Sequence, residues 1–433
     1  MPKKQLTIEE KMNNALVPEE EWPYKLPDNW CWVKFSDTCK NVSSSKKKIK
    51  LQEYQSVGQF AIVDQGDGLI GGYINNKELV YDGILPVIVF GDHTRRVKFV
   101  NFPFVQGADG VKVLLPAECF IPEFYYYGLR NINIPDMGYR RHFPILNEMS
   151  FQLPPLSEQQ RIVDRIKSLF AKLDEAKEKI QNVLDGAESR KAAILHQAFT
   201  GKLTAKWREE NGVSDDSWEK KTLDSICVSI YDGDHMAPPK TESGIPFLVI
   251  SNVNKGKLSF ENTRFVSKEY YDSVSDTRKP QLGDVLYTIV GSYGIPVVVD
   301  NDRAFCFQRH MALLKPSKVD TYFLWYQLQT KEFYNKATEI ATGTAQLTVP
   351  IKGLRKLKIS LPVQAEQQEI VHRLDNLLNK EKSICKSCEV SLAAIEAMKK
   401  AILAKAFRGE LGTNNPAEES AKELLTNCLT TVV

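Results

Sequence analysis

The chain repeats one long segment of itself, and this duplication constrains its fold more than any other feature. The stretch LPPLSEQQRIVDRIKSLF at residues 153–170 returns as LPVQAEQQEIVHRLDNLL at residues 361–378. Aligned at a constant shift of 208 without a gap, residues 153–203 and 361–411 share 20 identical residues in 51 positions. Two copies of a large unit therefore follow each other along the chain.

Each copy of the repeated segment predicts one long helix. The first copy starts after its prolines, where Ser157 and Gln160 form an S-x-x-Q capping pattern, and the copies end at Gly201 and Gly409. Apolar residues alternate at spacings of four and three, as in the seam of a coiled coil. The predicted seam of the first copy contains Ile162, Ile166, Leu169, Leu173, Ala176, Ile180, Val183 and Ala187. The predicted seam of the second copy contains Ile370, Leu374, Leu377, Glu381, Ile384, Cys388, Ser391 and Ile395.

Two arrangements of these helices fit the pattern. Each could pack as an amphipathic helix on its own globular domain, and Glu381 and Ser391 weaken the second seam. A seam of about four heptads with charged flanks is long for a surface helix, however, and the two copies supply each other's partner. We therefore expect an antiparallel intramolecular coiled coil. A helix from Ser157 to Phe199 has 43 residues, which corresponds to roughly 65 Å.

The segments before the two helices have a different character. Both contain short runs of Val, Ile, Phe, Tyr and Thr between Gly, Asp, Asn and Pro, which predicts mixed domains dominated by twisted sheet. Local helices are expected at PEFYYYGLRN and TYFLWYQLQTKEFYNKA, and both domains open alike, with NWCWVKFSDTC and SWEKKTLDSIC related by a shift of 188. The fold class is therefore α+β, with two sheet-dominated domains and two long helices in a pseudo-two-fold arrangement. The expected segments are 1–22, 23–152, 153–203, 204–217, 218–360, 361–411 and 412–433.

Composition argues against a membrane protein, a secreted protein and a disulfide-rich protein, and it does not decide whether the chain binds nucleic acid. A net charge of +3 is weak evidence for any partner, because nucleic-acid binding depends on where the charge lies. No apolar run approaches the roughly 20 residues of a membrane span, and the N-terminal stretch is acidic where a signal peptide is apolar. A cytoplasmic protein is expected. Eight scattered cysteines do not suggest a disulfide framework, and Cys385 and Cys388 form a C-x-x-C without a second pair of metal ligands.

Catalytic motifs are missing from the sequence. Gly66, Gly68 and Gly71 form a G-x-G-x-x-G, but strand and turn residues follow them, so a turn between strands is favoured over a dinucleotide site. There is no P-loop, no Asn/Asp-Pro-Pro-aromatic tetrapeptide, no G-x-S-x-G and no H-E-x-x-H. We expect a chain that is not an enzyme on its own.

Polar residues that could read a nucleic acid cluster in predicted loops of both sheet domains. Arg, Lys, Asn and Gln suit base edges in the major groove, whereas Lys, Thr and backbone amides suit phosphates. For each residue taken singly, and more strongly for the run Lys46–Lys48, the favoured interpretation is a solvated loop residue, and the candidates gain weight only as sets in paired domains. The candidates in the first domain are Lys46, Lys47, Asp92, His93, Thr94, Arg95, Arg96, Tyr139, Arg140 and Arg141, with Lys48 and His142 beside them. Those in the second are Asp234, His235, Lys240, Ser292, Tyr293, Gln308, Arg309, Thr342, Thr344 and Gln346, with His310 beside them.

Over nearly its whole length, the chain resembles the specificity subunits of type I restriction-modification enzymes. The resemblance lies in the two L-P-[PV]-x-x-E-Q-Q-x-I-V helix starts, the ends AFTGKL and AFRGEL, the Trp-headed domain openings and the ATGTAQ before the second helix. It implies two target recognition domains, at 23–152 and 218–360, each binding half of a split double-stranded DNA sequence. It also implies spacer helices at 153–203 and 361–411, packed antiparallel.

The resemblance further implies partners and cofactors. Two methyltransferase (modification) subunits would dock on the helices, and translocating endonuclease (restriction) subunits would join them. This chain would bind no cofactor and no metal, while S-adenosylmethionine, ATP and Mg²⁺ would belong to the partner subunits. Because the domains differ, the target should be asymmetric, and the helix length should set its unread spacer. Three alternatives stay open: a DNA methyltransferase or nuclease with its own active site, a modification-only assembly, and a structural scaffold that does not bind DNA.

Overall fold

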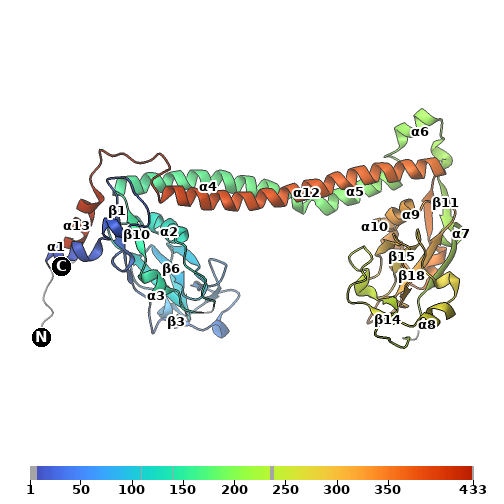
Figure 1. Ribbon diagram of the computed structural model, residues 1–433, viewed down its shortest axis with the longest axis horizontal. Helices are drawn as coiled ribbons and strands as arrows, with labels where there is room; N and C mark the ends of the chain where they lie inside the picture. Colours follow the sequence, from blue (N-terminus) through green and yellow to red (C-terminus); the bar gives the residue numbers. More distant parts are fainter. Residues whose placement is uncertain (1–6, 109, 139, 235–237, 432–433) are drawn as a thin grey trace. The chain divides into compact units, whose positions relative to one another are not determined.

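The computed structural model describes residues 7–108, 110–138, 140–234 and 238–431. These residues form two compact units (Figure 1). Unit 1 contains residues 1–180 and 390–433, and unit 2 contains residues 181–389. No helix in the described part of the chain is long and apolar enough to cross a membrane.

The described residues of unit 1 form three sheets. A two-stranded antiparallel sheet pairs β1 (Cys31–Lys34) with β10 (Ser150–Leu153). An antiparallel sheet has the order β2-β9-β6-β7, with β2 Cys39–Asn41, β9 Val111–Pro116, β6 Val87–Gly91 and β7 Val97–Val100. A mixed sheet has the order β3-β8-β4-β5, with β3 Lys48–Ile49, β8 Phe104–Gly107, β4 Phe60–Val63 and β5 Gly72–Ile74.

Unit 2 repeats this plan. A two-stranded antiparallel sheet pairs β11 (Glu219–Thr222) with β19 (Lys358–Leu361). An antiparallel sheet has the order β12-β18-β15-β16, with β12 Cys227–Asp232, β18 Met311–Pro316, β15 Val285–Thr288 and β16 Pro296–Val298. The mixed sheet has the order β14-β13-β17, with β14 Arg264–Val266, β13 Ile245–Leu248 and β17 Cys306–Phe307. The duplication inferred from the helices therefore extends through the sheets.

Short helices cover the sheets. The first predicted local helix is confirmed as α2 (Pro122–Asn131). The second is split into α9 (Thr321–Leu328) and α10 (Lys331–Glu339), because the Thr330 hydroxyl accepts a hydrogen bond from Phe333 N and starts a new helix. The remaining short helices are α1 Ile8–Ala15, α3 Phe143–Asn147, α6 Ala205–Asn211, α7 Leu223–Ile226, α8 Lys268–Ser273, α11 Ile351–Lys356 and α13 Ala421–Thr431.

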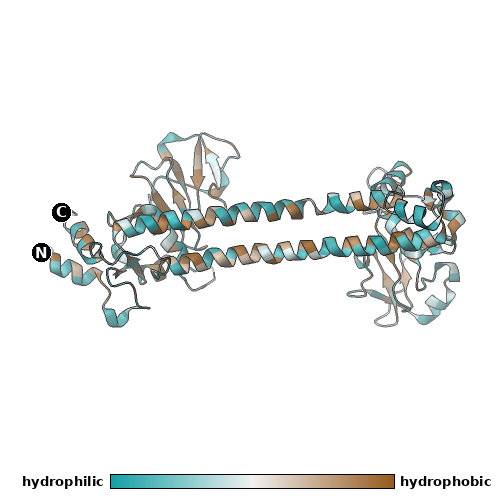
Figure 2. Ribbon diagram, turned by 90° about the horizontal axis from the view of Figure 1, so that it is seen from above, coloured by the Kyte–Doolittle hydropathy of each residue, from teal (hydrophilic) through white to brown (hydrophobic). Residues whose placement is uncertain are grey.

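The repeated segment forms long helices, and the expectation of one unbroken helix per copy is wrong for the first copy. The second copy is a single helix, α12 (Gln364–Ala406). The first copy is α4 (Leu156–Asp185) followed by α5 (Ala187–Phe199), interrupted at Gly186. Glycine is a poor helix former, and a Cβ there would lie 2.8 Å from Arg190 Nη1. Figure 2 shows apolar and polar residues alternating along α4 and α12.

The helices contact each other through ion pairs within each unit. In unit 1 Lys177 Nζ lies 2.6 Å from Glu396 Oε1, and Lys399 donates to Asp174. In unit 2 Arg190 Nε lies 2.8 Å from Glu381 Oε2. Residue numbers fall on α12 as they rise on α4, so the contacting segments of unit 1 run in opposite directions.

The predicted seam has two environments. Its first members on each helix, Ile162, Ile166, Ile370 and Leu374, are fully buried in the core of their own sheet domain. Farther along, Leu169, Leu173, Ala176, Ile180, Ala187, Leu377, Glu381, Cys388 and Ser391 are half-buried, and Ile395 is buried. The start of each helix thus packs on its own sheet domain. This part matches the alternative of an amphipathic helix on a globular domain, which we did not favour from the sequence.

Two seam positions are predicted wrongly. Val183 is 38% exposed and Ile384 is 42% exposed, whereas their neighbours Leu184 and Cys385 are half-buried. A straight α-helix drifts by about 20° per heptad relative to a strict seven-residue repeat. The buried face has therefore moved to the next residue.

Each long helix is anchored at its start by a buried Glu-Gln pair. Glu158, Gln159, Glu366 and Gln367 are at most 2% exposed. The Gln159 amide oxygen accepts from Ile121 N at 2.7 Å, and the Gln367 amide oxygen accepts from Asp320 N at 2.9 Å. The amides therefore tie each long helix to the backbone just before α2 or α9.

The glutamate of each pair, Glu158 or Glu366, binds a segment that lies far away in the sequence. Glu158 accepts a hydrogen bond from Thr413 Oγ1, and burial raises its pKa. Glu366 accepts from Thr204 Oγ1 at 2.7 Å, from Arg208 Nη1 at 2.6 Å and from Trp218 Nε1 at 3.2 Å. The E-Q-Q motif is thus a structural clamp in both units.

Candidate nucleic-acid interface

Two loops of unit 1 that carry predicted DNA-binding residues lie against each other. The first connects β6 to β7 and contains residues 92–96, and the second is the 132–142 loop between α2 and α3. His142 is fully buried and joins them: its Nδ1 lies 2.9 Å from Asp92 O, and its Nε2 accepts from Met137 N at 3.3 Å. The backbone N–H of His142 also donates to Asp92 O at 2.8 Å. A neutral imidazole that donates through Nδ1 satisfies both ring contacts.

Asp92 supports these loops from inside. It is 2% exposed, and its carboxylate accepts a hydrogen bond from Phe143 N at 2.7 Å. Its side chain is therefore committed to the protein, in contrast to the surface position expected from the sequence.

A third loop, residues 64–71 between β4 and β5, completes this end of unit 1. The turn between strands predicted at the glycines is confirmed, because β4 and β5 pair antiparallel on either side of it. Gln65 receives hydrogen bonds from His93 N at 3.2 Å and from Thr94 Oγ1 at 2.7 Å. The sequence did not predict that this loop contacts the 92–96 loop. The only available signal was the polar residues among the glycines in DQGDGLIGGY.

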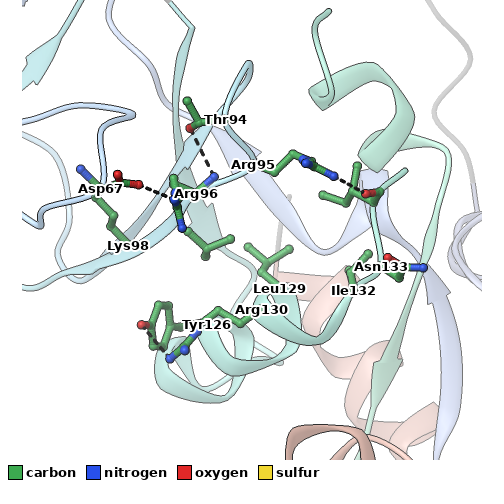
Figure 3. A pocket seen from close by; sticks show the side chains of 12 residues that line it. Asp67, Thr94, Arg95, Arg96, Lys98, Tyr126, Leu129, Arg130, Ile132 and Asn133 are labelled. Carbon is green, nitrogen blue, oxygen red and sulfur yellow. Dashed lines mark hydrogen bonds and ion pairs between the residues drawn. The ribbon is translucent and has the colours of Figure 1, made fainter. Parts of the chain in front are cut away.

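Cations and carboxylates surround a cavity of about 630 Å³ beside these loops (Figure 3). Arg95 Nη2 lies 2.6 Å from Asp136, Arg96 pairs with Asp67, and Lys98 Nζ lies 3.3 Å from Asp64. The pKa of Asp136 is lowered by a hydrogen bond from Gly138 N and by the charge of Arg95, whereas burial lowers the pKa of Lys98 against the pull of Asp64. Arg130, which the sequence analysis did not select, reaches the rim and lies over the Tyr126 ring.

The other candidates in unit 1 are on the surface. Lys47 Nζ pairs with Asp82 at 2.6 Å, and this hydrogen bond is the main cause of the lowered pKa of that carboxyl. Lys46 is exposed, and its backbone N–H donates to Ser44 Oγ at 3.2 Å. Arg140 and Arg141 are exposed and form no ion pair within the described part of the chain. Tyr139 lies outside the described residues.

Unit 2 builds the same pair of loops. Residues 289–295 connect β15 to β16, and residues 340–350 connect α10 to α11. Val349 N donates to Ile289 O at 2.8 Å, as His142 N donates to Asp92 O in unit 1, and Gly291 N donates to Leu347 O at 3.0 Å. Ser292, Thr342, Thr344 and Gln346 are exposed on these loops. The candidates Ser292 and Gln346 are thus brought together although 53 residues of the sequence separate them.

Tyr293 belongs to the scaffold of this loop pair. It is 9% exposed, its hydroxyl lies 2.9 Å from Thr338 Oγ1, and its ring stacks on Tyr334 at 5.3 Å between centroids. Tyr334 is 43% exposed and was not selected from the sequence.

The remaining candidates in unit 2 lie near the contact between Asp234 and Gln308. Asp234 forms an isolated bridge with Gln308 and accepts a hydrogen bond from Tyr270, whose pKa is raised by burial and by this carboxylate. Gln308 Nε2 lies 3.0 Å from His310 Nδ1, and burial lowers the pKa of His310, with Arg309 adding to the effect. Arg309 and Lys240 are exposed, and His235 lies outside the described residues.

The two units therefore present one scaffold with two sets of side chains. Each displays a loop pair closed by the same backbone hydrogen bond, and the exposed residues on those loops differ in charge and shape. Variable loops on a constant frame are typical of recognition modules. The fold is that of a recognition protein with two related modules in one chain.

Comparison with known proteins identifies the family. The model of the type I restriction modification DNA specificity domain matches twice, at residues 27–185 and 215–386, and the chain belongs to this family. It is 28% identical over 293 residues to the type I restriction enzyme EcoBI specificity subunit of Escherichia coli, covering 63% of this chain and 60% of that protein. It is 24% identical over 432 residues to the MjaVIII specificity subunit of Methanocaldococcus jannaschii, covering 90% of this chain and 95% of that protein.

Solved structures agree on the fold. The HsdS subunit from Thermoanaerobacter tengcongensis superimposes with a TM-score of 0.57 at 19% identity, covering 90% of this chain and all of that one. A chain from work described as the structural basis of complex assembly and conformational transition of the type I R-M system superimposes with a TM-score of 0.63 at 20% identity, with the same coverage. The match to EcoBI spans about 60% of that relative's length.

Proposed function

We propose that this chain is the DNA specificity subunit of a type I restriction-modification complex. Each unit reads one half of a split double-stranded DNA target with its loop pair. The observation that carries this proposal is the repetition of one loop scaffold with different exposed side chains in the two units. Because the side chains differ, the two half-sites differ and the target is asymmetric.

The long helices act as the spacer. We propose that α4 and α5 pack against α12 as an antiparallel intramolecular coiled coil and relate the two target recognition domains by a pseudo-two-fold axis. The opposite direction of the contacts Lys177–Glu396 and Lys399–Asp174 supports this arrangement. In this role the helices fix the number of unread base pairs between the half-sites.

The chemistry belongs to other chains. We infer that two methyltransferase subunits dock on the helices and that endonuclease subunits join this core in the cytoplasm. The described residues include no group of three or more His, Cys, Asp or Glu side chains placed to hold a metal ion. We further propose that S-adenosylmethionine, ATP and Mg²⁺ bind to the partner subunits, and that this chain supplies no cofactor site or catalytic residue of its own.

A binding selection tests the proposal. The purified full chain is incubated with a pool of random duplex DNA at two salt concentrations, because phosphate contacts raise nonspecific affinity at low salt. Retained DNA should contain two unequal defined sequences separated by a fixed unread spacer. Retention without any sequence preference at either salt concentration would favour a nonspecific scaffold and contradict the proposal.

A further inference from the structure

The four arginines on the 92–96 and 132–142 loops of unit 1 fall into two groups. Arg95 and Arg96 are engaged by Asp136 and Asp67, and Arg95 Nη1 also donates to Ile134 O at 3.1 Å. Arg140 and Arg141 are exposed and form no ion pair or hydrogen bond through their guanidinium groups within the described residues. An incoming DNA group therefore competes with no carboxylate for Arg140 and Arg141.

Hydrogen bonds from buried groups hold the segment beside these two arginines. Buried His142 holds Met137 N through Nε2 and Asp92 O through Nδ1, and Gly138 N donates to Asp136 Oδ1 at 2.9 Å. The backbone that carries Arg141 is thus fixed at the next residue. Because this backbone is already ordered, less conformational entropy is lost when the side chain binds a planar nucleobase.

The corresponding loop of unit 2 contains no arginine. Thr342 and Thr348 exchange two backbone hydrogen bonds of 2.8 Å and close the loop. The exposed Gln346 amide lies close to Gly291, where an added Cβ would approach Gln346 Nε2 to 3.0 Å. Gln346 is therefore an uncharged group that can both donate and accept, and it lies on the loop that corresponds to the loop of Arg140 and Arg141 in unit 1.

These side chains prefer different bases. The guanidinium fork of arginine matches the O6 and N7 acceptors of guanine in the major groove, whereas the amide of glutamine matches the N6 donor and N7 acceptor of adenine. Resting on the proposed function, we propose that unit 1 reads guanine through Arg140 and Arg141 and that unit 2 reads adenine through Gln346. The half-site bound by unit 1 therefore contains guanine, and the half-site bound by unit 2 contains adenine.

Selections with variants of the full chain test this assignment. In Arg140→Gln/Arg141→Gln, guanine preference should fall by about 5- to 150-fold at one or two positions of a single half-site. The other half-site and the spacer should stay unchanged. Arg165→Gln is the matched control, because Arg165 is exposed on α4 and has no ion pair within the described chain; both half-sites should survive it.

Two further variants separate base reading from charge. Arg140→Lys/Arg141→Lys keeps both charges but loses the fork, so salt-dependent affinity should persist while guanine preference falls. Gln346→Arg should change one adenine of the other half-site to guanine. Thermal unfolding followed by circular dichroism verifies that each variant is folded, and the lysine variant serves if the glutamine variant is not.

Failure of this inference differs from failure of the proposed function. A split motif whose guanines are unaffected in both arginine variants, or whose second half ignores Gln346→Arg, would overturn the base assignment alone. A wild-type selection without any split motif would overturn the proposed function.

Discussion

At the scale of single residues, the buried carboxylates at the helix starts connect segments that lie far apart in the sequence. Glu366 is fully buried, and its charge is balanced by Arg208, which is itself 7% exposed. Removing one partner of such a pair leaves an uncompensated buried charge. Identity between the two copies marks Glu158 and Glu366 in the sequence, but their partners Thr413 and Arg208 come from unlike segments, so only the folded chain identifies them.

Arg208→Met should therefore lower the free energy of unfolding of unit 2 by about 3–5 kcal/mol. Urea denaturation of the full chain, followed by circular dichroism, measures the loss. Adding Glu366→Gln to this variant should recover most of it, because the unpaired charge disappears. Lys206→Met on the same helix is the control: Lys206 is 82% exposed, and its pair with Glu210 is worth less than about 1 kcal/mol. Equal losses in both single variants would refute this account.

At the scale of elements, the existence of the helices was predictable, and the bounds of α2 were too, but the internal breaks of the other helices were not. The apolar period identifies α4, α5 and α12, and Pro122 at the start of α2 fixes that helix correctly. The division of α9 from α10 depends on a capping hydroxyl inside an apolar run. The displaced seam at Val183 and Ile384 depends on a cumulative drift that a heptad count ignores.

The interruption at Gly186 gives a prediction at this scale. The second copy has Ala394 and Met398 where the first has Gly186 and Arg190, and α12 is continuous there. Gly186 has φ −78° and ψ −6°, which alanine can adopt, but its Cβ would displace Arg190 from Glu381. We expect Gly186→Ala to be nearly neutral in the wild type, because the gain in helix propensity offsets the displaced pair.

In the Arg190→Met background, the same substitution should instead stabilise the protein by about 1 kcal/mol. Urea denaturation of the four members of this double-mutant cycle measures the coupling between the two positions. Equal effects of Gly186→Ala in both backgrounds would show that Arg190 does not use the space at the glycine.

At the scale of the whole molecule, the sequence predicted two sheet domains and two helices, but not how the recognition loops assemble. The residues 92–96 and 140–141 were selected for their chemistry, and their proximity depends on His142 and Asp92, which are buried. In unit 2 the proximity of Ser292 and Gln346 depends on a backbone hydrogen bond between loops. Such long-range pairings leave no local pattern in a single sequence.

The proposed spacing role of the helices can be tested by changing their length. Four residues, about one turn and roughly 6 Å, are inserted into α4 after Ile180 and into α12 after Ser391. Inserting into both helices gives each added turn a partner. Selection from random duplex DNA should then yield a longer preferred spacer, by about two base pairs at 3.4 Å each, with both half-site sequences intact. The loops that we propose to read bases are not altered by the insertions.

The control for this experiment places four residues after Gly212, an exposed turn residue with φ 64° and no atom within 4 Å of an added Cβ. That insertion lengthens the chain without lengthening a helix, so its spacer should match the wild type. If the helix insertions also leave the spacer unchanged, the separation of the half-sites is set outside α4 and α12. If they abolish one half-site, the helices contribute to base reading as well as to spacing. A lengthened spacer with unchanged half-sites requires that reading and spacing reside in different elements of the chain.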